Sequence, residues 1–276
     1  VAELFYRNYE RDGSRSDQVQ QDKNDSMRLN TRFERQVNKN SDKVRLSYEK
    51  QNETELTRSS LSSLYIDQQV EELGLAYDGV RQFDEHRQIK FGLDTRSSSL
   101  ESNTADTLDE QRYALYSEGS WRFTDQQTLT VGLRQEWIHR TGLVDYDDQN
   151  LSPVVAHRYD FDDHWSLQTN ISQAFRSPKA ADLLSAVSIS TDIDAGSLNN
   201  PDRGGNPFLR PEKITAYEST LGFNIPAGGV NVTGFYRQID DYIESVIEQE
   251  NGRYVKRPQN QDHATTYGVE LSGRYA

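Results

Sequence analysis

Apolar and polar side chains alternate along much of the chain, and the alternation has the period of two that a β-strand imposes. The clearest run covers residues 128–137. Leu129, Val131 and Leu133 fall on one face of this predicted strand. Arg134 falls on the opposite face. The run therefore predicts a strand with one apolar face and one polar face.

Several of these runs carry aromatic residues where the apolar stretch begins and ends. Trp165 and Phe175 bound one run, and Leu167 lies between them on the same face. The run near the C-terminus starts at Tyr267 and ends at Tyr275. An apolar middle with aromatic ends is typical of lipid-facing strands that cross a membrane between two rings of interfacial aromatic residues.

About twelve strands are predicted when the weaker runs are included, and their connections alternate between long and short. Outer-membrane barrels have short turns on the periplasmic side and long loops outside, whereas a soluble β-sandwich or propeller has no reason to separate its loops in this way. The predicted strands cover roughly residues 2–8, 26–36, 42–50, 62–78, 86–96, 112–123, 127–138, 150–161, 165–176, 213–224, 228–243 and 263–275. The predicted long connections cover residues 9–25, 51–61, 97–111, 139–149, 177–212 and 244–262, and the short ones include 36–42, 124–126, 162–164 and 225–227. The predicted fold class is all-β: an antiparallel transmembrane β-barrel of the outer-membrane type, of which this chain supplies about twelve strands of a larger barrel.

Composition removes several other classes of protein. Only 34% of the residues are hydrophobic and no run of 18 apolar residues occurs, so the sequence predicts no transmembrane helix. A barrel is compatible with this composition because only alternate residues face lipid. The formal charge of −13 argues against a nucleic-acid partner, which Lys and Arg clusters would bind. The absence of Cys excludes disulfides, Cys-based zinc sites and thiol catalysis.

Two phrases flank the longest predicted connection. FRSP occupies residues 175–178 and GNPFLRPE occupies residues 205–212. Pro207 and Pro211 bias the residues before them to extended geometry, which suits a rigid loop exit that returns the chain to a strand. These phrases resemble the FRxP and NPxLxPE segments of TonB-dependent outer-membrane receptors. Supporting phrases occur in the family's order at 86–93, 115–118, 133–136, 151–153, 235–243 and 266–271.

The resemblance implies the function of an outer-membrane receptor, located in the bacterial outer membrane, that imports a scarce solute by TonB-coupled active transport. Of the family's cargoes, a ferric siderophore is favoured, with a haem or cobalamin receptor of the same family as an alternative. Complete members are expected to have about twenty-two strands and a plug domain through which the TonB energy-transducing complex acts. This sequence shows neither, so residues 1–276 are interpreted as a partial barrel domain without the plug.

The resemblance also implies that ligand meets the outer loops, above all residues 177–212. Arginine side chains suit anionic metal chelates because their planar forks bind carboxylate and phenolate oxygens with several donors. A solvated loop without ligand contact is the alternative for every candidate. The candidate ligand-binding residues are Arg176, Arg203 and Arg210 around this loop, and Tyr254, Lys256 and Arg257 on the predicted loop 244–262.

No enzyme, metal site or cofactor is predicted. The five His residues are scattered without an HExxH spacing, and no GxSxG phrase or catalytic triad spacing occurs. The acidic groups around Asp145 and Asp240 lack the spacing of an EF-hand. Three further readings stay open from the sequence alone: a passive outer-membrane porin or channel, a barrel enzyme, and a soluble β-rich binding module.

Overall fold

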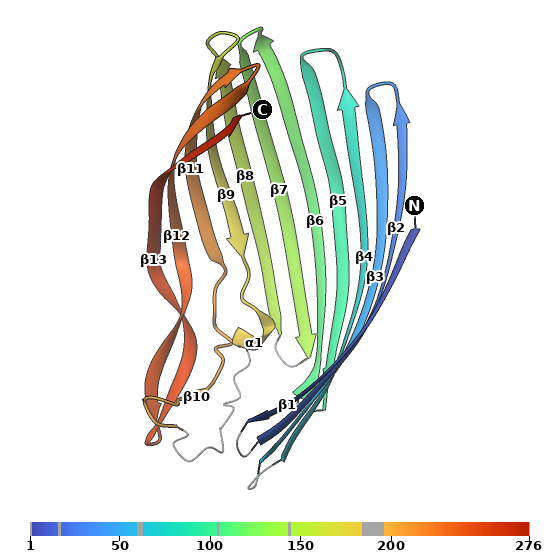
Figure 1. The fold of residues 1–276 in the computed structure, drawn as a ribbon, viewed down its shortest axis with the longest axis vertical. Helices are drawn as coiled ribbons and strands as arrows, with labels where there is room; N and C mark the ends of the chain where they lie inside the picture. Colours follow the sequence, from blue (N-terminus) through green and yellow to red (C-terminus); the bar gives the residue numbers. More distant parts are fainter. Residues whose placement is uncertain are drawn as a thin grey trace.

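The computed structural model describes residues 2–15, 18–59, 63–103, 105–142, 145–183 and 196–275. One curved sheet contains all the strands of this part of the chain (Figure 1). The twelve long strands are β1 (Ala2–Arg15), β2 (Gln18–Val37), β3 (Asn40–Ser59), β4 (Ser63–Gln82), β5 (Arg87–Ser102), β6 (Ala105–Thr124), β7 (Gln127–Gly142), β8 (Tyr146–Asp160), β9 (Trp165–Arg176), β11 (Glu212–Ile225), β12 (Gly228–Glu250) and β13 (Arg253–Tyr275). A short helix α1 (Ala180–Leu183) and a two-residue strand β10 (Asp202–Arg203) lie between β9 and β11.

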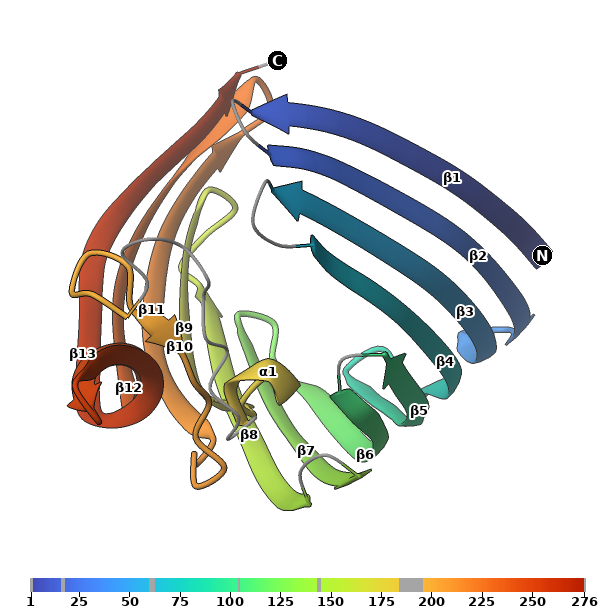
Figure 2. The same cartoon turned by 90° about the horizontal axis from the view of Figure 1, so that it is seen from below.

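Each long strand pairs antiparallel with the long strand before it, as the short connections predict. The prediction of about twelve strands is therefore confirmed, and β10 adds a thirteenth that pairs parallel with β13. Viewed along the strands, the sheet curves around a concave side, and α1 lies on that side (Figure 2). Among the described residues β1 has one strand neighbour, so it forms one edge of the sheet.

The convex face of the sheet is apolar and exposed, as the alternation predicts. Val131 and Leu133 of β7 are 50% and 48% exposed, and Leu115 of β6 is 54% exposed. Exposed apolar area on this scale marks contact with another apolar phase. This face, called the lipid face below, contacts the hydrocarbon of the membrane in a barrel.

Aromatic side chains border the lipid face at two levels. Tyr217, Tyr236 and Tyr267 are register partners on adjacent strands and form one row. Near the short turns, Trp165 packs against Phe223 with ring centroids 4.7 Å apart. These rows match the two interfacial girdles of an outer-membrane barrel.

The concave face, called the inner face below, carries charged and small polar groups. Arg237 of β12 pairs with Glu218 of β11 at 2.7 Å, and Arg134 pairs with Glu136 at 3.0 Å. This is the polar face on which the alternation predicts Arg134, and it corresponds to the lumen side of a barrel. No helix in the described part of the chain is long and apolar enough to span a membrane.

Five of the six predicted long loops are wrong, because the strands continue through most of them. The predicted loop 244–262, for example, consists of the ends of β12 and β13 joined by a turn at Asn251 and Gly252. Both turn residues have positive φ, 49° and 82°, as a tight hairpin turn of the I′ type requires. Residues 16–17, 60–61, 104 and 143–144 of the other four loops, and residues 184–195 of the predicted connection 177–212, lie outside the described residues.

The strands are consequently much longer than a membrane crossing needs. A crossing takes about 9–11 residues, whereas β6 has 20 residues and β12 has 23. The parts beyond the membrane, called the outer ends below, contact lipid on neither side, so alternation is not required there. Only the predicted connection 177–212 remains long, and it contains α1 and β10.

Candidate ligand-binding site

The long β9–β11 connection begins with an anchor on the inner face. Arg140 of β7 donates from Nη1 to the carbonyl oxygen of Pro178 at 2.8 Å. Ser177 donates from Oγ to the Asp148 carboxylate, also at 2.8 Å. Pro178 and Leu183 are fully buried. The start of this connection, including α1, is therefore packed onto the inner face instead of extending freely above it (Figure 2).

A buried ion pair supports the anchor. Arg140 is 4% exposed and pairs with Glu110 of β6 at 2.5 Å. Burial acts to raise the pKa of the Glu110 carboxyl, but the guanidinium groups of Arg140 and Arg112 together outweigh it and the net pKa is lowered. Glu110 is therefore held ionised beside Arg140. Burial, with the Asp148 carboxylate nearby, raises the pKa of Tyr146, whose ring lies 5.3 Å below the Arg140 guanidinium.

The second half of the connection runs along the outer end of β13. Gly204 donates its backbone N–H to the carbonyl of Lys256 at 3.1 Å, and Asn206 donates from Nδ2 to the carbonyl of Pro258 at 3.2 Å. Asn260 exchanges two bonds with the backbone of Arg210, at 2.8 and 3.0 Å. The segment therefore covers the edge of β13 at its outer end.

The two phrases at the ends of the connection, residues 175–178 and 205–212, are tied to each other and form a rigid frame. Arg176 of the first phrase forms an ion pair with Glu212 of the second. Glu212 is 1% exposed, and its Oε1 also accepts the backbone N–H of Ile243 at 2.8 Å. Leu209 is buried, whereas Phe208 beside it is 87% exposed. The rigid loop exit predicted from the prolines agrees with this arrangement.

The three arginines predicted as one positive cluster are separate, and two of them are neutralised. Arg176 is held by Glu212, and Arg210 forms an ion pair with Asp241. Arg203 lies on β10, beside neither of them. Arg176 and Arg210 are held apart because each pairs with a carboxylate far away in the sequence, Glu212 of β11 and Asp241 of β12. A ligand-binding role for these residues stays a prediction.

Tyr254, Lys256 and Arg257 lie on β13 and not on a loop, which corrects the sequence prediction. Arg257 is committed to two partners: it pairs with Glu250 at 2.7 Å and donates to the carbonyl of Gly205 at 2.7 Å. The hydrogen bond to Glu250 raises the pKa of Arg257. Arg257 therefore fixes the connection in place.

Arg203 and Lys256 are brought together by the structure. They are register partners in the parallel β10–β13 pair, so their side chains leave the same face of the sheet. Tyr254, two residues before Lys256, lies on that face too. Both cations are exposed, and neither has a side-chain hydrogen bond or ion pair within the described part of the chain. Arg203 and Lys256 are called the cation pair below.

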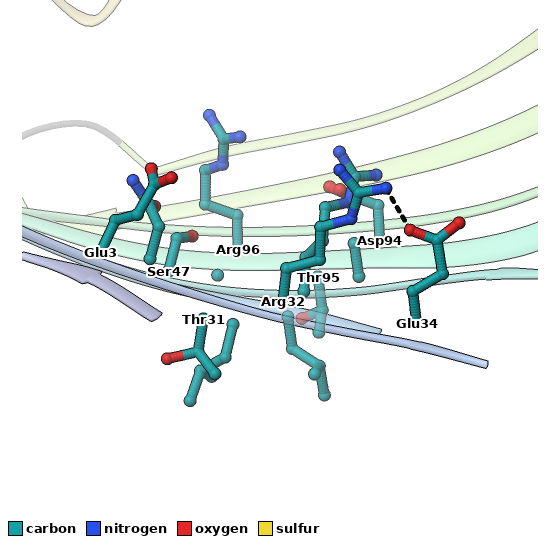
Figure 3. A pocket seen from close by; sticks show the side chains of 14 residues that line it. Glu3, Thr31, Arg32, Glu34, Ser47, Asp94, Thr95 and Arg96 are labelled. Atoms are coloured by element: carbon teal, nitrogen blue, oxygen red, sulfur yellow. Dashed lines mark hydrogen bonds and ion pairs between the residues drawn. The ribbon is translucent and has the colours of Figure 1, made fainter. Parts of the chain in front are cut away.

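A second feature of the inner face is a hollow of about 740 Å³ over β1 to β5. Glu3, Arg32, Glu34 and Arg96 rise from the inner face there, with Arg32 paired to Glu34 (Figure 3). The charges are mixed in sign, which suits a polar lumen wall. Within the described ranges, no group of three or more His, Cys, Asp or Glu residues could hold a metal ion.

Sequence reasoning missed two features of the site. The Glu110–Arg140 anchor lies on strand ends that were predicted as loops, so its cross-strand pairing was not visible. The exposed Phe208 lies within the motif itself, where an aromatic residue between two prolines was the available signal.

The fold and its two faces define a β-barrel wall of the outer-membrane class, with an apolar lipid face, two aromatic girdles and a polar inner face. The family model described as TonB dependent receptor-like, beta-barrel, matches residues 3–276. The chain therefore belongs to the TonB-dependent receptor family and is a protein of the bacterial outer membrane.

Solved receptors and transporters share the fold at low sequence identity. A double mutant of the Serratia marcescens hemophore receptor HasR, in complex with its hemophore HasA and heme, is 14% identical with a TM-score of 0.72, and the match covers 94% of this chain and 49% of that one. The copper transporter OprC is 16% identical with a TM-score of 0.73, over 94% and 45% of the two chains. The siderophore receptor PirA from Pseudomonas aeruginosa is 13% identical with a TM-score of 0.64, over 96% and 58%.

The chain thus spans about half the length of these structures. The family model and the three structures give no sign of a porin. The family is one of receptors, and the three structures are named as receptors or a transporter. No curated protein matches the chain in sequence.

Proposed function

We propose that residues 1–276 form part of the barrel domain of a receptor that imports a ferric siderophore across the outer membrane. Uptake in this proposal is driven by the TonB energy-transducing complex, which acts through a plug domain encoded outside these residues. The family match supports a TonB-dependent receptor, and one structure with the same fold is named as a siderophore receptor.

The cation pair is the observation that favours an anionic chelate as cargo. Arg203 and Lys256 are exposed on one face at the outer end of β13, beside Tyr254. Two cations without a described carboxylate partner can bind the negative charge of a ferric catecholate or hydroxycarboxylate, and the Tyr ring offers an adjacent aromatic surface.

The remaining candidates position this surface instead of binding the cargo. Arg257 and Arg210 are each paired with a carboxylate while they hold the connection against β13. Arg176 ties the two ends of the connection together through Glu212. Removing any of these three side chains is expected to release the β9–β11 connection from β13 as well as to change its charge. The cation pair is therefore the better place to test cargo binding.

The test is binding and uptake of a ferric siderophore by the complete receptor with Arg203→Gln and Lys256→Gln combined. Loss of two charge-assisted contacts predicts binding weaker on the order of thirtyfold. A matched control is Arg11→Gln with Lys23→Gln, which removes the same charge from the outer ends of β1 and β2. The control is expected to bind as the unmodified receptor does.

Equal binding by the cation-pair variant and the control would contradict the assignment of these residues. Uptake of haem or cobalamin without uptake of any ferric siderophore would replace the proposed cargo with the family alternative. Uptake that persists in cells lacking TonB would overturn the energy-coupled mechanism and favour a passive channel.

A further inference from the structure

The short-turn end of the sheet carries a charged cluster on the lipid face. The cluster consists of Arg35 of β2, Asp42 of β3, Tyr77 and Arg81 of β4 and Phe91 of β5, and is called the rim cluster. The register pairs Arg35 with Asp42, which places both on the face of the lipid-facing Phe33 and Val44. All five residues therefore belong to the girdle level nearest the short turns.

Arg81 is held rigidly at the centre of the rim cluster. It donates from Nη2 to the Asp42 carboxylate at 2.6 Å and from Nη1 to the carbonyls of Ser41 and Val80 at 3.1 and 2.9 Å. Its guanidinium lies 5.5 Å from the centre of the Phe91 ring. An arginine has five N–H donors, so these three bonds leave two donors available to a further acceptor.

The cluster has one more cation than anion. Asp42 also accepts a hydrogen bond from the Tyr77 hydroxyl at 2.6 Å, on Oδ1, the same oxygen that accepts from Arg81. Arg35 adds a second positive charge beside it and forms no hydrogen bond or ion pair with any side chain in the described ranges. The result is a fixed guanidinium and a free one, with a single carboxylate between them.

Exposed apolar side chains surround this positive site. Phe33 is 64% exposed and Phe83, in the adjacent short turn, is 70% exposed. By contrast, the lipid face at the short-turn ends of β8 to β13 carries Tyr159, Trp165 and Phe223 but neither Arg nor Lys within the described residues. The two cations of the rim cluster therefore distinguish β2 and β4 from β8 to β13. On β5, Arg87 lies on the same face but pairs with Asp84 at 2.6 Å.

We infer that the rim cluster binds the phosphate of an anionic phospholipid headgroup in the leaflet that faces the periplasm. Short turns mark the periplasmic side of an outer-membrane barrel. At that level the lipid face meets headgroups, and basic side chains there attract anionic lipids. Arg35 and the two remaining donors of Arg81 bind the phosphate oxygens, while Phe33 and Phe83 contact the upper acyl chains.

The test is lipid retention by the purified, complete receptor, measured by native mass spectrometry after addition of phosphatidylglycerol or phosphatidylcholine. The unmodified receptor is expected to retain phosphatidylglycerol preferentially. Arg35→Gln combined with Arg81→Gln is expected to reduce this retention roughly thirtyfold, the effect of two basic side chains near an anionic lipid. The control Arg122→Gln removes a charge from the inner face at the same end of the sheet and is expected to change nothing.

Three results would overturn the inference: equal retention of the two lipids by the unmodified receptor, equal loss in the control, or complete displacement of the lipid by inorganic phosphate. If the double variant does not assemble, Arg35→Gln alone serves, because it breaks no side-chain contact. Its expected effect is roughly a fivefold loss of phosphatidylglycerol, and unchanged retention contradicts the site.

Discussion

The membrane part and the outer end of the same strand differ in which side chains are exposed and which are buried. At the middle of β7, Val131 and Leu133 are half exposed and apolar. Toward the outer end of the same strand, Arg140 is almost completely buried and charged. The same strand therefore contacts lipid in its membrane part. At its outer end it is surrounded by water and by the packed β9–β11 connection.

The forces that hold the two parts differ accordingly. The membrane part presents apolar side chains to lipid, so its stability depends on keeping charge off that face. The outer ends are joined by cross-strand ion pairs such as Arg257–Glu250 and Glu110–Arg140. Removing one of these outer-end pairs is therefore expected to loosen the outer ends and leave the membrane part intact.

The largest effect is expected from Arg140→Ala. The substitution removes the closer of the two cations that pair with the partly buried Glu110, leaving Arg112 at 3.1 Å, and it removes the bond to the carbonyl of Pro178. Breaking a buried pair predicts a local loss of about 3 kcal/mol. Hydrogen exchange at residues 179–183 should then accelerate, while exchange in the membrane part of β7 stays slow.

The control for this variant is Arg158→Ala, which breaks an exposed pair with Asp160 near the short turns. Exposed pairs contribute about 0–1 kcal/mol, so exchange at residues 179–183 should not change. Equal acceleration by both variants would show that Arg140 does not anchor the connection.

A smaller effect is expected from acid. Because the folded pKa of Glu110 is lowered, its contribution to stability is complete above the ordinary Glu pKa of about 4.3 and is lost as the pH falls through the lowered value. Protonation releases Arg140, so exchange at residues 179–183 should rise in this acid window. Glu110→Gln should remove the pH dependence, and a pH dependence unchanged in that variant contradicts the assignment.

Sequence patterns predicted the membrane part of the fold well, for a physical reason. Lipid on one side and a polar lumen on the other impose alternation, and residues 128–137 show it at every position except Gln135. The outer ends contact lipid on neither face, so no alternation was available and they were predicted as loops. The Asn251-Gly252 pair is the one local signal in this stretch for a tight hairpin turn, and both residues adopt the positive φ that such a turn requires.

The candidate site was harder to predict, because charge alone does not show which partners a side chain has. Arg176 and Arg210 are neutralised by Glu212 and Asp241, which lie 36 and 31 positions away in the sequence. Arg203 and Lys256 become neighbours only through the parallel pairing of β10 with β13. Such pairings depend on the folded connection, and local sequence carries no record of them.

The contrast between the two parts of the sheet is tested most directly with single cysteines carrying a spin label, since the chain has no natural Cys. In the complete receptor in lipid bilayers, labels at Val131 and Leu133 should be relaxed by oxygen, which concentrates in lipid. A label at Ile247, on the outer end of β12, should be relaxed by a water-soluble nickel complex. Preferential relaxation of Val131 and Leu133 by the nickel complex would contradict the account.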